Sequence, residues 1–429
     1  MDVLHNTSRF FCPHPSSPTL LRRRFSTVRS SLPFPNEKAK YHRELEAAVD
    51  VVERACRLCV DVKKSLFSSE GRILEKNDQT PVTVADFGVQ ALLSKFFPLI
   101  PLVAEEDSAF LRSNNLVDSV FSALTDKASS GEKSLTHDDI LEAIDRGGKD
   151  SFVFGMKPAT YWVLDPIDGT KGFLKGTEAL YVVGLALVVE GEIVLGVMGC
   201  PNWQEDKPLK STSEVQGNKN IVAGSGIIMV AHDGCGTWTK RLSSVLGTSA
   251  KTPESWTRCF VDSCCLVHEA HFCISDSQTW ESLPLSALFN ATTDADSVGD
   301  KEILLLPTCC GSPHIDSLSH AYATGTPRKA GFYGTKCLCK YLTVASGRAS
   351  IFILRARAQT TIKAWDHAVG MICVHEAGGK VTDWEGGQLD LGADQVGRRI
   401  IFPLGGVLVT NGSVHDKILE MISSTSSIV

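Results

Sequence analysis

Residues 162–172 read WVLDPIDGTKG, in which an apolar strand pattern ends in two carboxylates and a turn. The apolar residues Tyr161–Leu164 predict a short strand, and the proline after Asp165 keeps the backbone there extended. Asp168 follows three residues later, before a Gly-Thr pair that turns the chain. Two carboxylates on one tight turn need either hydration or a bound cation. Oxygen ligands favour a hard ion, Mg²⁺ first. The alternative is a capped turn with solvated acids.

Three further segments place carboxylates beside small residues or turn formers. They read KNDQTPVTVAD at 76–86, VAEED at 103–107 and WDHAVG at 365–370. Asp78 precedes a turn signal, Glu105 follows a short apolar strand pattern, and Asp366 stands at a predicted helix N-terminus. Taken singly, these acids have ordinary explanations as a turn former, a solvated acidic turn and an N-cap. Taken as a set, the four segments predict an acidic metal site.

Periodicity along the rest of the chain predicts alternating helices and strands. Apolar residues at three- and four-residue spacings predict a helix after Glu37, and a second helix is predicted over Phe87–Phe97 with Asp86 as its N-cap. Two apolar runs around Glu190-Gly191-Glu192 predict a hairpin. Further helices are predicted at 335–346, 365–377 and 414–423, and further strands at 349–354 and 406–410. This alternation indicates the α/β class.

Composition limits the functions that the chain can have. The chain has 429 residues, 43% hydrophobic and 21% charged, which is typical of a folded protein of two or three domains or one two-lobed unit. A formal net charge of −6 argues against a surface that coats nucleic acid. The longest strongly apolar run, at 181–189, is far shorter than the ~20 residues of a membrane span. Fourteen cysteines without a recurring spacing predict a reducing compartment and mostly buried thiols.

Residues 1–36 differ in composition from the rest of the chain. They are rich in Arg and Ser and contain a single acidic residue, Asp2. This composition predicts an organelle transit peptide, with a mitochondrial destination slightly favoured over a chloroplast. A disordered tail is the alternative interpretation.

The four acid segments together resemble the magnesium-dependent, lithium-sensitive phosphomonoesterases, a superfamily that includes inositol monophosphatase and fructose-1,6-bisphosphatase. DPIDGTKGFL at 165–174, GCPN at 199–202 and KAWDHAVG at 363–370 are most similar to its 3′(2′),5′-bisphosphate nucleotidase branch. The resemblance implies a layered αβαβα fold. An N-terminal α+β lobe would span residues 37–215, and a C-terminal α/β lobe would span residues 216–429. The site would lie between the lobes.

The resemblance also implies roles for individual residues. Glu105, Asp165, Asp168, Asp366 and the backbone carbonyl of Ile167 would bind two or three Mg²⁺ ions. Asp78 and Thr170 would orient and deprotonate the attacking water. The backbone N–H groups of Gly169 and Thr170 would hold the phosphate.

The implied substrate is adenosine 3′,5′-bisphosphate (PAP), hydrolysed to AMP and phosphate, with its sulfated relative PAPS as a second substrate. Lys340, Arg355, His320 and Asp366 would contact the substrate. Cys337 departs from the branch pattern, which has Ser there. An inositol phosphate phosphatase and a PAP-binding regulator with weak catalysis remain alternatives. We expect a monomer whose partner is a small molecule, neither nucleic acid nor a membrane.

Overall fold

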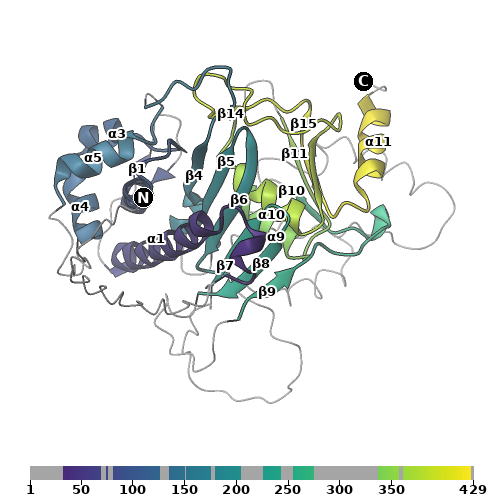
Figure 1. Cartoon of the computed structure of the whole chain (residues 1–429), viewed down its shortest axis with the longest axis horizontal. Helices are drawn as coiled ribbons and strands as arrows, with labels where there is room; N and C mark the ends of the chain where they lie inside the picture. The colour runs from purple at the N-terminus through teal and green to yellow at the C-terminus, as the bar shows by residue number, and fades with distance from the viewer. Residues whose placement is uncertain are drawn as a thin grey trace, which may run out of the picture.

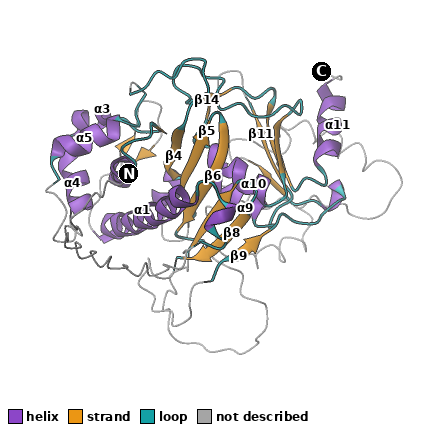
Figure 2. Cartoon of the chain, viewed as in Figure 1, coloured by secondary structure: helices purple, strands orange, loops and turns teal. Residues whose placement is uncertain are grey.

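The computed structural model describes residues 32–68, 74–75, 81–125, 135–149, 151–174, 179–203, 226–242, 255–274, 337–356 and 361–426. Its elements stack in layers across the molecule (Figure 1). Helices lie at the left of this view, followed by a large sheet, a second pair of helices, a smaller sheet and α11 (His415–Ser426). Figure 2 shows the same order by type of element.

The larger sheet has seven strands in the order of the chain. They are β3 (Leu102–Ala104), β4 (Tyr161–Asp168), β5 (Val182–Val189), β6 (Glu192–Cys200), β7 (Ile227–His232), β8 (Gly236–Arg241) and β9 (Thr257–Cys259). The first pair is parallel and the other pairs are antiparallel. The predicted hairpin is confirmed as β5–β6, where Glu190 and Gly191 both adopt positive φ at the turn.

Helices cover both faces of this sheet. Alternate residues of each strand point to opposite faces, so each strand contributes side chains to two cores. On one face, Leu185 and Val197 share a core with α1 (His42–Ser68) and α2 (Val84–Phe96). On the other face, Ala186 and Met198 share a core with α9 (Cys337–Ala345) and α10 (Ala368–Glu376). Three short helices pack on the outer side of α2: α3 (Ser108–Asn114), α4 (Val117–Thr125) and α5 (His137–Asp145).

The smaller sheet has the order β10 (Phe272–Ile274), β11 (Ile351–Arg355), β15 (Gly406–Thr410) and β13 (Lys380–Asp383). Its Phe352 and Val409 belong to the α9–α10 core, whereas Ile353 and Leu408 pack with α11. The layers therefore run helix, sheet, helix, sheet, helix, and the expected αβαβα arrangement is confirmed. Two short ribbons, β1 (Leu74–Glu75) with β2 (Pro81–Val82) and β12 (Ile362–Lys363) with β14 (Ile400–Ile401), and the helical turns Asn36–Lys38, Thr170–Leu174 and Val267–Glu269 complete the elements.

Several element boundaries differ from those that the sequence predicted. The N-cap of α2 is Thr83. Asp86 is the third residue of the helix, N3, and its side chain completes the capping box with Thr83. β4 continues through Asp168, whereas the apolar pattern ended at Leu164. The larger sheet continues past residue 215 to Cys259, because β7 pairs with β6. The predicted division into an N-terminal lobe, residues 37–215, and a C-terminal lobe, residues 216–429, stays a prediction.

The folded body also begins earlier than the predicted leader allows. Leu32 and Phe34 are each only 7% exposed and belong to the α1 core. The ring of Phe34 lies edge-on to His42 and His232, with centroids 6.3 and 6.1 Å away. The last residues of the predicted 1–36 segment are therefore part of the packed structure.

Two compositional expectations concern helices and thiols. Within the described residues, no helix is both long and apolar enough to cross a membrane. The described cysteines carry free thiols, and eight of the ten are buried, as predicted.

Candidate active site

The site begins at the end of β4, where Asp165 and Asp168 are both fully buried. In a regular strand, residues three apart point to opposite faces of the sheet. Here the pairing with β5 shifts between Asp165, opposite Gly184, and Asp168, opposite Val182. This irregularity changes the strand's alternation and brings both carboxylates to one site.

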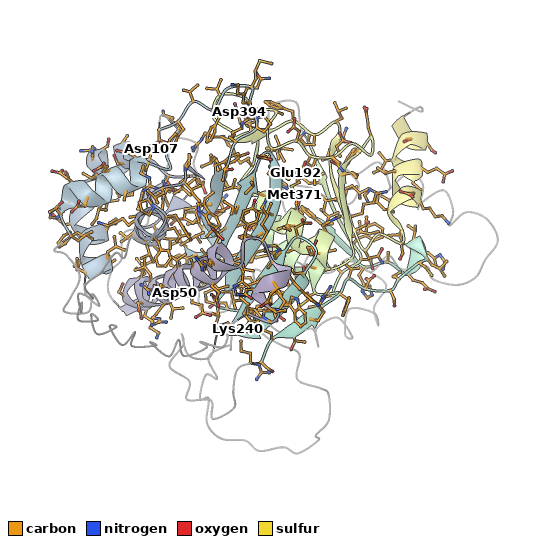
Figure 3. The ribbon with its side chains drawn as sticks, in the orientation of Figure 1. Asp50, Asp107, Glu192, Lys240, Met371 and Asp394 are labelled. Atoms are coloured by element: carbon orange, nitrogen blue, oxygen red, sulfur yellow. The ribbon has the colours of Figure 1, made fainter. Side chains whose placement is uncertain are left out.

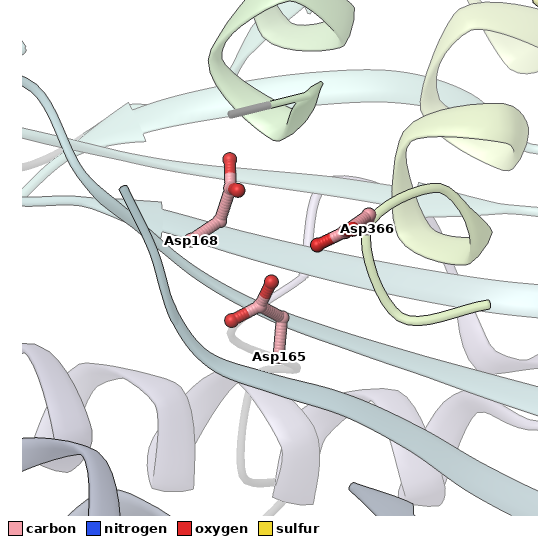
Figure 4. Close-up of side chains that lie close together, drawn as sticks. All are labelled: Asp165, Asp168 and Asp366. Carbon is pink, nitrogen blue, oxygen red and sulfur yellow. The ribbon is translucent and has the colours of Figure 1, made fainter. Parts of the chain in front are cut away.

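Asp366 reaches the same site from the turn that links β12 to α10. Figure 4 shows the three carboxylates converging. One oxygen from each of Asp165, Asp168 and Asp366 lies within 4.8 Å of the others. Three carboxylates at this separation repel one another, most strongly where water is excluded. Their oxygen-only donor set fits a hard divalent cation such as Mg²⁺.

Asp168 connects this acidic cluster to helix α9. The N–H of Leu338, in the first turn of α9, donates to Asp168 Oδ2 at 2.8 Å. The positive end of the helix dipole therefore faces the carboxylate. A Cβ at Gly184 would lie 2.5 Å from Leu338 Cδ1, so glycine allows α9 to approach β5 closely. The position of α9 is thus coupled to a predicted metal ligand.

Thr170 follows directly, at the start of a helical turn over Thr170–Leu174. Its hydroxyl lies 3.1 Å from the carbonyl oxygen of Ile167 and 3.3 Å from Asp86 Oδ1. The hydroxyl has one proton and donates it to one of these acceptors, which leaves its own lone pairs to accept a bond. Gly169 has φ +94°, which allows the sharp turn between the last strand residue and Thr170.

Glu105 comes immediately after β3 and is half-buried. Because Ala104 pairs in parallel with Leu164, Glu105 and Asp165 follow at neighbouring places on adjacent strands. Gln90 of α2 holds the backbone after Glu105: its amide accepts from the N–H of Glu106 at 2.9 Å and donates to the Glu106 carbonyl at 2.7 Å. Glu105 is not one of the three clustered acids, and its metal role stays a prediction.

The predicted substrate contacts are more scattered. Lys340 is fully buried in α9, with Nζ 5.4 Å from the centroid of the Phe352 ring. Arg355 is exposed at the end of β11. Asp78 and His320 lie outside the residues that the structure describes. The substrate roles of Lys340, Arg355 and His320 and the catalytic role of Asp78 therefore stay predictions.

His367, beside Asp366, is a buried packing residue. Its Nδ1 lies 2.8 Å from the hydroxyl of Tyr341. Burial, followed by the charge of Lys340, lowers the pKa of His367 to about 3. The imidazole is therefore neutral at physiological pH, and it forms part of the contact between α9 and α10.

Three residues to which the sequence gave no role in the site support it: Asp86, which was predicted only as a helix cap, Gln90 and Arg399. The sequence contains a local signal for Asp86, because Thr83 and Asp86 have the spacing of a capping box. No local pattern marks Gln90 or Arg399, because their partners lie far away in the chain.

The chain is similar to known proteins over most of its length. Residues 43–279 and 306–426 match the model of the inositol monophosphatase family. An Arabidopsis thaliana protein named "Putative 3′(2′),5′-bisphosphate nucleotidase, mitochondrial" is 62% identical over 413 residues, covering 95% of this chain and 94% of that one. An Oryza sativa 3′(2′),5′-bisphosphate nucleotidase is 31% identical over 400 residues, covering 89% and 94%. Among solved structures, a Thermotoga maritima IMPase has a TM-score of 0.48 and 18% identity, covering 90% and 98%. By the extent of the family match and the identity to these relatives, the chain belongs to the inositol monophosphatase family.

Proposed function

We propose that this chain is a Mg²⁺-dependent phosphomonoesterase that removes the 3′-phosphate of PAP, yielding AMP and phosphate, and that also accepts PAPS. The observation that carries the proposal is the convergence of Asp165, Asp168 and Asp366 from two distant parts of the chain. The substrate class rests on the name of the Arabidopsis thaliana relative that is 62% identical.

The metal-binding residues of the proposal are the three clustered acids, Glu105 and the carbonyl of Ile167. Bound Mg²⁺, in two or three positions, would lower the pKa of a coordinated water and neutralise charge on the phosphate. The Ile167 carbonyl retains a lone pair for an ion even when Thr170 donates to it, because a carbonyl oxygen has two.

Hydrolysis then needs a water that is aligned with the phosphorus atom. Thr170 accepts a hydrogen bond from this water, and Asp78 takes its proton. A bond forms between the water oxygen and phosphorus as the bond to the 3′-oxygen breaks. The 3′-oxygen takes a proton from a solvent water, and Asp78 returns the proton that it accepted to solvent. The N–H groups of Gly169 and Thr170 hold the phosphate oxygens at the turn. General-base help of this kind is worth about 10²–10⁴ in rate.

The nucleotide would lie against α9 and the end of β11, where Lys340 and Arg355 stand, with His320 as a further contact. Asp366 would contact both the metal and the substrate. We expect a monomer that binds a small molecule, with neither nucleic acid nor a membrane as a partner. The net charge of −6 agrees with the first exclusion.

The proposed location is an organelle, reached by means of the Arg-rich N-terminal segment, with the mitochondrion favoured over the chloroplast. The word "mitochondrial" in the name of the Arabidopsis relative supports this choice.

The experiment is a comparison of phosphate release from three substrates in Mg²⁺ by the chain beginning at Ser31. PAP, inositol 1-phosphate and inositol 1,4-bisphosphate are tested at equal concentration. A strong preference for PAP is expected. A preference for an inositol phosphate would keep the metal site and reject the nucleotide contacts. Tight PAP binding without phosphate release would indicate a regulatory protein.

A further inference from the structure

Arg399 contacts two segments that are far apart in the chain. One carries Glu105 and the other carries Asp366. Arg399 lies just before β14, in a loop whose backbone N–H groups converge on Asp394; the N–H of Arg399 itself donates to Asp394 Oδ2 at 2.9 Å. The Arg399 carbonyl accepts from the N–H of Ala364 at 2.8 Å, next to the β12–β14 pairing. The main chain of Arg399 therefore holds the segment that leads to Asp366.

The guanidinium of Arg399 reaches the end of β3, which is 295 residues away in sequence. Nη2 donates to the carbonyl of Ala104 at 2.6 Å, and Nη1 donates to the carbonyl of Gly147 at 3.1 Å. The same Gly147 carbonyl accepts from the N–H of Ala104 at 2.9 Å. This closed set of hydrogen bonds fixes both backbone polar groups of the residue immediately before Glu105.

The guanidinium carbon Cζ of Arg399 lies over the indole of Trp365, 4.7 Å from the ring centroid. Trp365 is 4% exposed and immediately precedes Asp366. Stacking of this kind attracts the cation to the ring. One side chain thus touches the neighbour of Glu105 and the neighbour of Asp366.

Charge reinforces this placement. Burial lowers the pKa of Arg399, while Asp107, Glu105 and Asp394 act to raise it. Asp107 and Asp394 are labelled in the upper part of the molecule in Figure 3. The guanidinium stays protonated at any physiological pH, so it offers these acids a permanent positive charge. A lysine has neither the planar fork for two carbonyls nor the flat stacking face.

We propose that Arg399 is a positioning residue that sets the separation of Glu105 and Asp366, and thereby the metal affinity of the site. This inference rests on the metal-binding part of the proposed function and is independent of the substrate. Residues that orient metal ligands without touching the metal commonly change its affinity about 10–100-fold when substituted.

The neighbouring Arg398 provides a matched control. It is 4% exposed, and its guanidinium donates to the carbonyls of Gly155 at 2.8 Å and Lys157 at 3.0 Å, and to that of Gly392. Both arginines therefore lie in the loop before β14 and donate hydrogen bonds to backbone carbonyls that are distant in sequence. The carbonyls to which the Arg398 guanidinium donates lie in neither of these two acid-bearing segments, so the two residues separate a general structural role from a role at the site.

The test is a titration of the full chain with Mn²⁺ alone, in which free Mn²⁺ is followed by electron paramagnetic resonance. Arg399→Lys is expected to weaken Mn²⁺ binding about 10-fold, and Arg398→Lys is expected to leave it unchanged, with thermal unfolding measured for both. If Arg399→Lys does not fold, Trp365→Phe, which keeps a smaller stacking surface, is expected to weaken Mn²⁺ binding to a lesser degree.

Unchanged Mn²⁺ affinity in the folded Arg399→Lys variant, or in Trp365→Phe if it replaces that variant, would overturn the inference. Equal weakening by Arg398→Lys would also overturn it. Mn²⁺ binding without phosphate release from PAP would reject the proposed substrate alone. A lack of Mn²⁺ binding by the unsubstituted chain would reject the metal site and this inference together.

Discussion

The hydroxyl of Thr170 lies 3.3 Å from Oδ1 of Asp86, a buried carboxylate of helix α2. The other oxygen, Oδ2, accepts from both the N–H and the hydroxyl of Thr83, at 2.8 and 2.6 Å. Asp86 therefore serves two purposes at once, because it caps α2 and orients the threonine at the end of β4. The resemblance implied that Thr170 pairs with Asp78, which lies outside the described residues, and the structure places the carboxylate of Asp86 near that hydroxyl.

Substitution Asp86→Asn tests this relationship. The amide retains an acceptor for Thr83 but removes the charge that attracts the Thr170 proton. We expect kcat to fall about 10-fold, a part of the 10²–10⁴ that general-base help supplies. The measurement is steady-state phosphate release, with KM recorded separately so that a change confined to binding is recognised.

Asp139→Asn is the matched control for Asp86→Asn. Asp139 forms the same capping box with Thr136 at the start of α5, but it is exposed and lies outside the site. Loss of a cap costs about 1 kcal/mol of stability in either helix. The proposed role of Asp86 requires that only its own variant loses turnover; an equal loss in both variants would reduce that role to stability.

Asp168→Asn should eliminate turnover while preserving the fold. The amide oxygen can still accept the hydrogen bond from Leu338, so α9 keeps its position, whereas one charge of the metal cluster is lost. Mg²⁺ should raise the melting temperature of the unsubstituted chain, because a ligand that binds the native state stabilises it. We expect a smaller rise in the variant, measured by thermal unfolding with Mg²⁺ and with EDTA. Full activity of Asp168→Asn would contradict the assignment of this residue as a metal ligand.

His415 should make the stability of the protein depend on pH. It is fully buried, with its ring nitrogens 3.0 and 2.9 Å from the hydroxyls of Thr382 and Thr410. Burial, with the charge of Lys380, lowers its pKa from 6.5 to about 4. Between these values the unfolded chain binds a proton that the folded chain does not, so stability falls as the pH is lowered. The full loss is about 3 kcal/mol, since one pKa unit corresponds to about 1.4 kcal/mol.

Urea unfolding of His415→Gln at several pH values between 7 and 4 checks this expectation. Glutamine can bond to the two threonines but does not titrate. The variant should show a flatter dependence of the unfolding free energy on pH, with a residual slope from the buried His367. An unchanged slope would show that other groups carry the acid sensitivity.

Removal of residues 1–36 should destabilise the protein, whereas removal of residues 1–30 should not. Leu32 and Phe34 are buried against α1, and burial of one such side chain contributes about 1.5–3 kcal/mol. We expect the chain that begins at Glu37 to lose about 3 kcal/mol relative to the chain that begins at Ser31. Denaturant midpoints measure the difference; equal midpoints would indicate that these residues contribute nothing to the core.

Local patterns in the sequence predicted much of the fold. The β5–β6 hairpin, the helices α1, α2, α9, α10 and α11, and the strands β11 and β15 follow from periodicity and turn residues over short spans. The acids at 165 and 168 are three residues apart on one strand, so their proximity needs only the local irregularity of β4. Strand β8 was not predicted because its sequence, GTWTKR, contains a single large apolar residue, and strand β9 was not predicted because three residues are too few for a clear period.

The sequence by itself determined the α/β class, the helix and hairpin positions and the set of acidic residues, because each depends on neighbours within a few turns of chain. The layered αβαβα order was implied by the family resemblance. Tertiary structure alone decided that β7 extends the larger sheet and that Asp86 faces Thr170. It decided how Asp366, which the resemblance had assigned to the metal site, reaches Asp165 and Asp168. It also decided that Arg399 contacts the segments beside Glu105 and Asp366. These pairings join residues that are far apart in the chain. Their physical cause is the packing of whole layers, which leaves no periodic signal in the local sequence.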